Sequence, residues 1–192
     1  MTPEQIEASL RRTPVADLLP RRSQARATGL DGDARLIDAL DLGDGCLIAL
    51  VDVAERQIVV PGRVRGDEFA RDAGVAVRLH DGDVGSFRVS MREALTGPVR
   101  TIDVDQSNDS VVLADTVVKW QVDLAPSPAP QRLRALVDSR ITAEPRAIVE
   151  WVAPDGQVCT VLTATDFKEQ AQDGWTWAVD LVRAHAQGLD VD

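Results

Sequence analysis

QSNDSVVLADTVVKW, residues 106–120, predicts two short β-strands joined by a tight turn. The first strand, residues 110–113, follows a small polar turn at residues 107–109. The second, residues 116–121, carries Lys119, one of only two lysines in the chain. A strand-borne lysine near a small-residue turn is how an ATP-binding lobe of the kinase type holds phosphates. The same pattern is also that of an ordinary β-hairpin with an exposed lysine, and spacing alone favours this second interpretation.

The composition is that of an acidic globular protein. The 192 residues are 44% apolar and 27% charged, with a formal net charge of −10, and a chain of this length can bury a sizeable core. The negative charge argues against nucleic acid as a main partner, because binding to phosphate backbones needs a basic surface. Residues 1–12 lack the apolar stretch of a secretory signal, and no apolar run reaches the ~18 residues of a membrane helix. We therefore expect a soluble cytoplasmic protein with no membrane partner.

Upstream of the hairpin, the pattern predicts a β-rich module preceded by a short helix. Thr2 is a suitable N-cap for that helix, because Gln5 follows three residues later. The arginine-rich stretch 21–33 is typical of a solvated loop, with anion binding as the alternative. The further elements expected here are three antiparallel strands within residues 34–62, a helix from Gly66 to Gly74, strands at 75–79 and 85–91, and a helix at 91–95.

Downstream of the hairpin, Pro126, Pro128 and Pro130 predict an extended connector. A helix at 131–139, two strands around the Asp155-Gly156 turn, and a closing helix at 174–187 are expected to follow. The order of elements predicts an α+β fold in two parts that divide near Gly97-Pro98. Residues 1–97 would be a β-rich cap subdomain. Residues 98–192 would resemble the amino-terminal lobe of a protein kinase, an antiparallel sheet with flanking helices.

Two longer segments carry a family resemblance. SNDSVVLADTVVKWQVDLAPSPAPQRLRAL, residues 107–136, resembles the ATP-lobe segment of the maltokinase family. LTATDFKEQAQDGWTWAVDLV, residues 162–182, resembles the linker between the two lobes of that family. The first ~100 residues are similar to its amino-terminal cap, with weaker motif support.

This resemblance implies an ATP site. The polar turn would be a short phosphate loop, and the strand lysine would steady the α- and β-phosphates. The Asp-Phe pair in the second segment would lie at the hinge that meets the adenine. The candidate ATP-binding residues are therefore Ser107, Asn108, Ser110, Lys119, Asp166 and Phe167.

Two departures from the family pattern argue against catalysis. Gln131 stands where the family has a glutamate that pairs with the strand lysine. The sequence ends at Asp192, whereas a kinase also needs the groups of a carboxy-terminal lobe that hold magnesium and align the acceptor. We therefore expect a non-catalytic binding or regulatory module, in effect a pseudokinase. The alternative is an ATP-binding component of a sugar or small-molecule kinase, completed in trans by a separate carboxy-terminal lobe. A scaffold without ligand is the third interpretation.

The remaining chemistry-bearing residues predict structural roles. His80 and His185 lie 105 positions apart, with no nucleophile elbow near either. Cys46 and Cys159 lack the spacing of metal ligands, and two free buried thiols are expected.

Tryptophans point to a candidate interface. Trp151, Trp175 and Trp177 gather in the last 42 residues. Core packing is the simpler interpretation of this cluster. Alternatively, Trp175 and Trp177 form a carboxy-terminal face that binds a protein partner or a second copy of the chain, because exposed aromatic residues mark interfaces.

Overall fold

The structure is a computed structural model that describes residues 1–20, 24, 32–101, 109–137, 139, 143–169 and 174–187. Its strands are β1 (Arg35–Gly43), β2 (Cys46–Val53), β3 (Arg56–Arg65), β4 (Glu68–Arg71), β5 (Gly82–Val84), β6 (Phe87–Met91), β7 (Val99–Thr101), β8 (Asp109–Leu113), β9 (Thr116–Ala125), β10 (Pro145–Val152) and β11 (Val158–Asp166). Its helices are α1 (Pro3–Arg12), α2 (Val15–Leu18), the 3-10 helix η2 (Ala73–Arg78), α4 (Ala129–Ala135) and α5 (Gly174–Ala186).

The described strands pair antiparallel throughout. The main path runs β1-β2-β3-β9-β11-β10-β6-β5, with β4 on β3, and with β8 between β7 and β9. The connection between β3 and β9 is a single residue pair, Ile58 with Asp123. We therefore refer to β1–β4 as sheet A and to β5–β11 as sheet B. The described part of the chain is thus a mixed fold dominated by antiparallel sheet with few helices, as the sequence predicted at the level of fold class.

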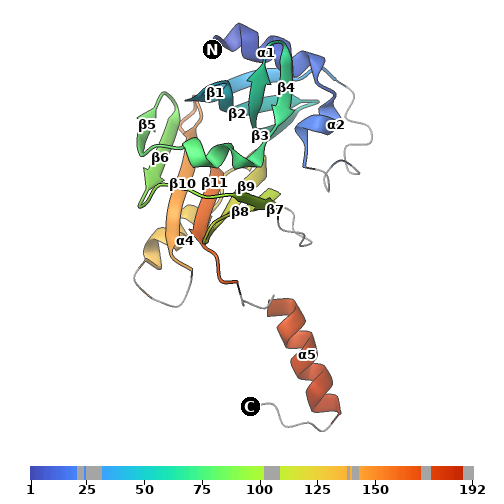
Figure 1. The fold of residues 1–192 in the computed structure, drawn as a ribbon, viewed down its shortest axis with the longest axis vertical. Coiled ribbons are helices and arrows are strands. Elements are labelled where there is room, and N and C mark those ends of the chain that lie inside the picture. Colours follow the sequence, from blue (N-terminus) through green and yellow to red (C-terminus); the bar gives the residue numbers. More distant parts are fainter. Residues whose placement is uncertain are drawn as a thin grey trace.

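The layers follow from two apolar clusters. One cluster lies between the sheets and combines residues of β2, such as Ile48 and Leu50, with residues of sheet B, such as Trp120 and Val149. The other lies on the outer face of sheet A, where Leu10 of α1 is fully buried. Figure 1 shows the resulting order, with α1 above sheet A, α2 at its side, sheet B below it, and α4 beside β10 and β11. The face of sheet B that looks away from sheet A therefore lies outside the main core.

Local signals explain the first helix. The Thr2 hydroxyl accepts from the backbone N–H of Gln5, and the Gln5 side chain accepts from the backbone N–H of Thr2. This is the capping box that the sequence predicted, which satisfies two donors at the helix start. Ile6 and Leu10, four residues apart, then form the buried face of α1.

The segment between residues 66 and 95 corrects three predictions. The expected helix from Gly66 is instead β4, which pairs with β3. The expected strand at 75–79 is instead part of η2, because Val75 and Ala76 are buried between the sheets and the turn of η2 brings both into contact with the core. The expected helix at 91–95 is not helical in the structure. Short apolar runs do not distinguish helix from strand by periodicity, so tertiary contacts determined the outcome.

The predicted elements after Gly97 agree better with the structure. The hairpin forms as β8 and β9, and the Asp155-Gly156 turn joins β10 and β11. α4 lies two residues earlier than expected at its start. Strand β6, which precedes Gly97, pairs with β10, which follows it, so backbone pairing crosses the expected boundary. The division into residues 1–97 and 98–192 stays a prediction.

Helix α5 stands apart from the sheets in Figure 1. Its side chains Trp177 and Val182 are 55% and 67% exposed. None of the described helices is long and apolar enough to cross a membrane.

Candidate nucleotide-binding site

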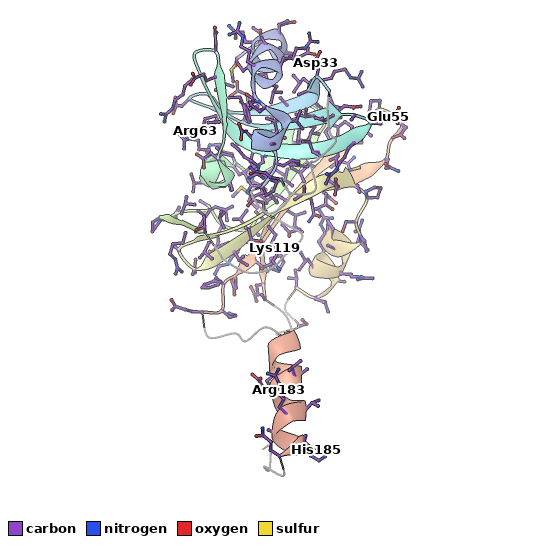
Figure 2. All side chains as sticks on the ribbon, turned by 90° about the vertical axis from the view of Figure 1, so that its right-hand side faces the viewer. Asp33, Glu55, Arg63, Lys119, Arg183 and His185 are labelled. Atoms are coloured by element: carbon purple, nitrogen blue, oxygen red, sulfur yellow. The ribbon has the colours of Figure 1, made fainter. Side chains whose placement is uncertain are left out.

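Lys119 lies in the middle of sheet B and points away from sheet A. Burial alternates along β9, with Val118 and Trp120 fully buried in the core between the sheets. Because successive side chains of a strand point to opposite faces, Lys119 lies on the outer face. Figure 2 labels Lys119 on sheet B, in the half of the molecule from which α5 extends. The outer face of sheet B is therefore the place to look for a phosphate site.

A row of side chains crosses the outer face at the level of Lys119. Lys119 pairs with Ser110 on β8 and with Thr163 on β11, and Thr163 pairs in turn with Ile148 on β10. Directly paired residues of antiparallel strands share a face and have Cβ atoms about 4.5–5.5 Å apart. The register therefore brings Ser110 beside Lys119. That the two residues belong to one phosphate site stays a prediction.

A second row lies one step nearer the end of β11. Val117, two residues before Lys119, pairs with Val112 on β8 and with Thr165 on β11. Val112 also pairs with Arg100 on β7. In this row Val112 is buried and Val117 is partly exposed, so Val117 supplies the apolar surface next to Lys119, with Arg100 at the edge of the row.

Lys119 forms no hydrogen bond or ion pair within the described part of the chain.

 Helix α4 carries no acidic residue, and Gln131, the expected substitute for the missing glutamate, is exposed at its start. A different ion pair joins this helix to the sheet. Arg134 of α4 donates from Nη2 to Oε2 of Glu150 on β10 across 2.6 Å and from Nη1 to Oε1 across 3.3 Å. In this ion pair the basic residue lies on the helix and the acidic residue on the strand. This is the reverse of the pair between a strand lysine and a helix glutamate that the family pattern contains.

Asp166 lies at the end of β11, and its carboxylate is already engaged. Arg146 on β10 donates from Nε to Oδ1 of Asp166 across 2.5 Å, and Lys168 donates to Oδ2 across 3.2 Å. The hydrogen bond from Arg146 is the main cause that lowers the pKa of Asp166 below its usual value. Asp166 is therefore an ionised anchor for the end of β11.

Phe167 continues the chain beyond this anchor. Its backbone N–H donates to the carbonyl of Asp115, in the β8–β9 turn, across 2.6 Å. The guanidinium carbon of Arg100 lies 5.6 Å from the centroid of its ring, within the range of a cation–π contact. The backbone N–H of Phe167 is therefore not available to an adenine ring in this arrangement.

The structure groups the predicted residues unevenly. Ser110 and Lys119 are direct neighbours, whereas Asp166 and Phe167 lie at the end of β11, at the level of the β8–β9 turn. Ser107 and Asn108 lie outside the described residues. Their predicted contact with phosphates stays a prediction, as do that of Ser110 and Lys119 and the predicted place of Asp166 and Phe167 at the hinge beside the adenine.

Sequence reasoning missed the arginines around this face. Arg146 also donates to Glu93 and to Asp115, so it connects four strand ends. Its partners lie 20 to 53 positions away in the sequence. No local spacing rule could have identified them. From the sequence, only the start of a strand after Pro145 could be predicted.

No group of three or more His, Cys, Asp or Glu side chains is placed to hold a metal ion in the ranges that the structure describes.

Two characterised proteins are similar to this chain, and no protein-family model matches it. The glucosamine kinase of Mycolicibacterium smegmatis is 35% identical over an alignment of 169 positions, which covers 79% of this chain and 42% of that protein. The glucosamine kinase of Streptacidiphilus jiangxiensis is 34% identical over an alignment of 214 positions, which covers 98% of this chain and 48% of that protein.

Solved structures of glucosamine kinase share the fold. Crystal form A of the enzyme superposes with a TM-score of 0.74 and 30% identity, over 98% of this chain and 47% of that one. A complex with glucosamine, ADP and inorganic phosphate superposes with a TM-score of 0.74 and 28% identity, over 98% and 46%. The chain therefore spans about half the length of the relatives that it matches.

These relatives correct the predicted family and role. The chain is similar to glucosamine kinases, so the assignment to the maltokinase family is wrong. The quoted segments describe a lysine-bearing hairpin and a linker, and motifs this short do not separate one sugar kinase family from another. The expected non-catalytic module, or pseudokinase, is contradicted as well, because the similar proteins are kinases and one is solved with ADP. They support the alternative, an ATP-binding component of a sugar kinase.

Proposed function

We propose that this chain forms the nucleotide-binding half of a sugar kinase of the glucosamine kinase type. In this proposal Lys119 binds the phosphates of ATP, and the phosphoryl acceptor is an amino sugar. The single observation that carries it is the position of Lys119. The only lysine on the outer face of sheet B among the described residues lies beside Ser110, in a fold that superposes over 98% of its length on a kinase solved with ADP.

Charge makes Lys119 suited to this role. No described carboxylate forms a salt bridge with it, so its ammonium can balance the charge of a phosphate without first leaving another anion. Transfer of a phosphoryl group depends mainly on positioning and on electrostatic stabilisation of the phosphate oxygens. Lys119 would supply both from a rigid central strand.

The rest of the outer face would hold the nucleoside. Val117, which is partly exposed beside the buried Val112, offers apolar surface two residues along β9 from Lys119, a separation of about 7 Å at the rise of a strand. An adenine bound there would direct the phosphates of its nucleotide toward Lys119. This arrangement, with α4 on the same face, is the one that we infer to be like the amino-terminal lobe of a protein kinase.

The end of β11 would border the adenine. Since the Asp166 carboxylate is held by Arg146 and the Phe167 N–H by Asp115, these groups would shape the pocket and leave hydrogen bonding to backbone groups that follow. Ser107 and Asn108 would complete the phosphate side.

The groups that align the acceptor and hold magnesium would come from the second half of such a kinase. We propose that α5 contacts that half through Trp177 and Val182, whose exposed apolar surface would be buried on contact. Trp175 belongs to the same proposed face, and its side chain lies outside the described residues.

Thermal unfolding with Mg-ADP and Mg-ATP tests the nucleotide site. A ligand at ten times its Kd stabilises the folded chain by about 1.4 kcal/mol, which raises the Tm of a chain of this size by roughly 3–6 °C. We expect such a rise for the wild-type chain and its loss in Lys119→Met. Arg35→Ala, which also removes one positive charge but lies on β1 of sheet A, is the matched control and should retain the rise.

The second half is tested by adding it. The carboxy-terminal half of the Streptacidiphilus jiangxiensis glucosamine kinase, mixed with this chain and Mg-ATP, should transfer the γ-phosphoryl group of ATP to glucosamine and release ADP. Absence of any Tm rise at millimolar nucleotide would overturn the proposed function.

A further inference from the structure

Strand β4 of sheet A and helix η2 contact the β8–β9 hairpin at two adjacent points. Asp109 on β8 and Trp120 on β9 are paired residues, and both side chains point toward sheet A. Arg71 of β4 donates from Nη1 to Oδ2 of Asp109. Trp120 donates from Nε1 to the carbonyl of Ala73, at the start of η2, across 2.9 Å. Two elements that follow β3 therefore hold neighbouring points of one hairpin.

These two points flank the candidate phosphate-binding residues. Asp109 immediately precedes Ser110, and Trp120 immediately follows Lys119. Ser110 and Lys119 are themselves paired, and they lie on the opposite face of the sheet. Any movement of Asp109 would therefore move Ser110 relative to Lys119, because adjacent residues of a strand share one stiff backbone.

The ion pair of Arg71 is enclosed. The side chains of Arg71 and Asp109 are 13% and 20% exposed, so solvent screens the pair less than it screens a surface pair. Arg71 also donates from Nε to the carbonyl of Leu18, at the end of α2, across 3.3 Å. The guanidinium thus connects α2, β4 and the first residue of β8.

Stability alone does not account for this arginine. Its Nη2 atom is buried and makes no hydrogen bond among the residues that the structure describes. A buried donor without a partner costs folding free energy, and such groups in native structures call for an explanation. A role in orienting Asp109 supplies one, since a planar guanidinium fixes direction as well as charge.

We propose that Arg71 is a positioning residue for the nucleotide site, which acts through Asp109 to hold Ser110 in register beside Lys119. This inference rests on the proposed function. It adds that sheet A, which carries none of the candidate ATP-binding residues, sets the geometry of the phosphate end of the site.

The experiment compares two ligands on one set of variants. The dissociation constants of Mg-ADP and of adenosine are measured by calorimetry for the wild-type chain, Arg71→Met and Asp109→Asn. We expect both variants to weaken Mg-ADP by about tenfold or more and to leave adenosine within about twofold, because only the phosphates reach the displaced residues. A purely structural role would weaken both ligands alike. Arg71→Lys, which keeps the charge, should recover part of the affinity for Mg-ADP.

Arg56→Ala is the matched control. Arg56 of β3 also forms an ion pair with β9, from Nε to Oδ1 of Asp123 across 2.5 Å, but Asp123 lies four residues beyond Lys119. This variant should bind both ligands as the wild type does. Amide hydrogen exchange gives a second readout on the same proteins, in which Arg71→Met and Asp109→Asn should speed exchange at the start of β8 and Arg56→Ala should not.

The outcomes separate the two proposals. If the wild-type chain binds Mg-ADP and Arg71→Met and Asp109→Asn bind it equally well, the positioning role is wrong and the nucleotide site stands. If the wild-type chain binds no nucleotide, the proposed function fails and the positioning role fails with it. If Arg71→Met does not fold, Asp109→Asn, which keeps the shape of the side chain, decides between these results.

Discussion

The guanidinium of Arg146 on β10 contacts the carboxylate of Asp166 at the end of β11, with 2.5 Å between Nε and Oδ1. The same guanidinium donates to Asp115 in the β8–β9 turn and to Glu93 after β6. These contacts fasten the strand ends from which the chain leaves sheet B. The chain therefore leaves the end of β11 in a fixed direction, as the proposed nucleotide site at this edge of sheet B would need.

The Arg146–Asp166 contact predicts a dependence of stability on pH. The folded-state pKa of Asp166 lies below the value of about 3.9 for an unfolded aspartate. A group of this kind contributes stability above its unfolded pKa, and loses that contribution as pH falls through its folded pKa. Asp166→Asn should therefore lower the free energy of unfolding at pH 7. The difference from wild type should shrink below about pH 4. Urea denaturation at a series of pH values measures it, and a difference that is constant with pH would contradict the prediction.

The Arg134–Glu150 pair predicts an asymmetric effect of substitution. The Glu150 side chain is 7% exposed and that of Arg134 is 43% exposed. Arg134→Ala leaves a buried carboxylate unpaired and should cost about 1–3 kcal/mol, less than for a fully buried pair because water reaches the arginine. Arg134→Ala combined with Glu150→Met should recover most of the loss. Arg132→Ala, on the same helix but exposed, is the control. Chemical denaturation gives all three values, and equal costs for Arg134 and Arg132 would argue against the pair.

Trp120 predicts a loss that is specific to its indole N–H. Trp120→Phe removes the hydrogen bond to the carbonyl of Ala73 and part of a fully buried side chain. The expected cost is about 1–3 kcal/mol, because a buried carbonyl loses its partner and a small cavity remains. Trp177→Phe, at a position that is 55% exposed, should stay within about 0.5 kcal/mol. Thermal unfolding of both variants tests this difference. Equal losses of stability for Trp120→Phe and Trp177→Phe would contradict the prediction.

Gly62 predicts a steric effect at the β3–β4 pair. A Cβ atom added there would lie 2.3 Å from Cζ of Phe69 and 2.6 Å from the carbonyl oxygen of Ala70. Gly62→Ala should therefore destabilise the chain by about 1–3 kcal/mol. Gly32→Ala is the control, because its nearest new contact is at 3.9 Å, and it should be neutral or slightly stabilising. Similar Tm values for the two variants would show that β4 moves freely.

Much of sheet B was predictable because its signals are local. The alternating burial of β9 and the Asp155-Gly156 turn each involve a few adjacent residues. Residues 66–79 were mispredicted because their conformation follows from long-range packing. Phe69 lies over Gly62, and Val75 is enclosed by both sheets.

The candidate site likewise combines contacts that local sequence signals predict with contacts that depend on long-range packing. Ser110 and Lys119 could be paired from the sequence, because a tight turn sets the register of the two strands that it joins. The contacts of Arg71, Arg134 and Arg146 could not, because each arginine meets a partner 16 or more positions away. The family was mistaken for a related reason, since hairpin and linker motifs are shared too widely to name one kinase.

Residues 106–121 thus contain enough information to form a lysine-bearing hairpin, because turn chemistry and period-two burial act between near neighbours. They do not determine three ion pairs, which are Arg71 with Asp109, Arg134 with Glu150, and Arg146 with Asp166. The contact of Arg71 with Asp109 exists only once sheet A and sheet B have packed, and the other two only once α4, β10 and β11 have come together. Tertiary packing of this kind brings distant charges within hydrogen-bonding distance and shields them from water.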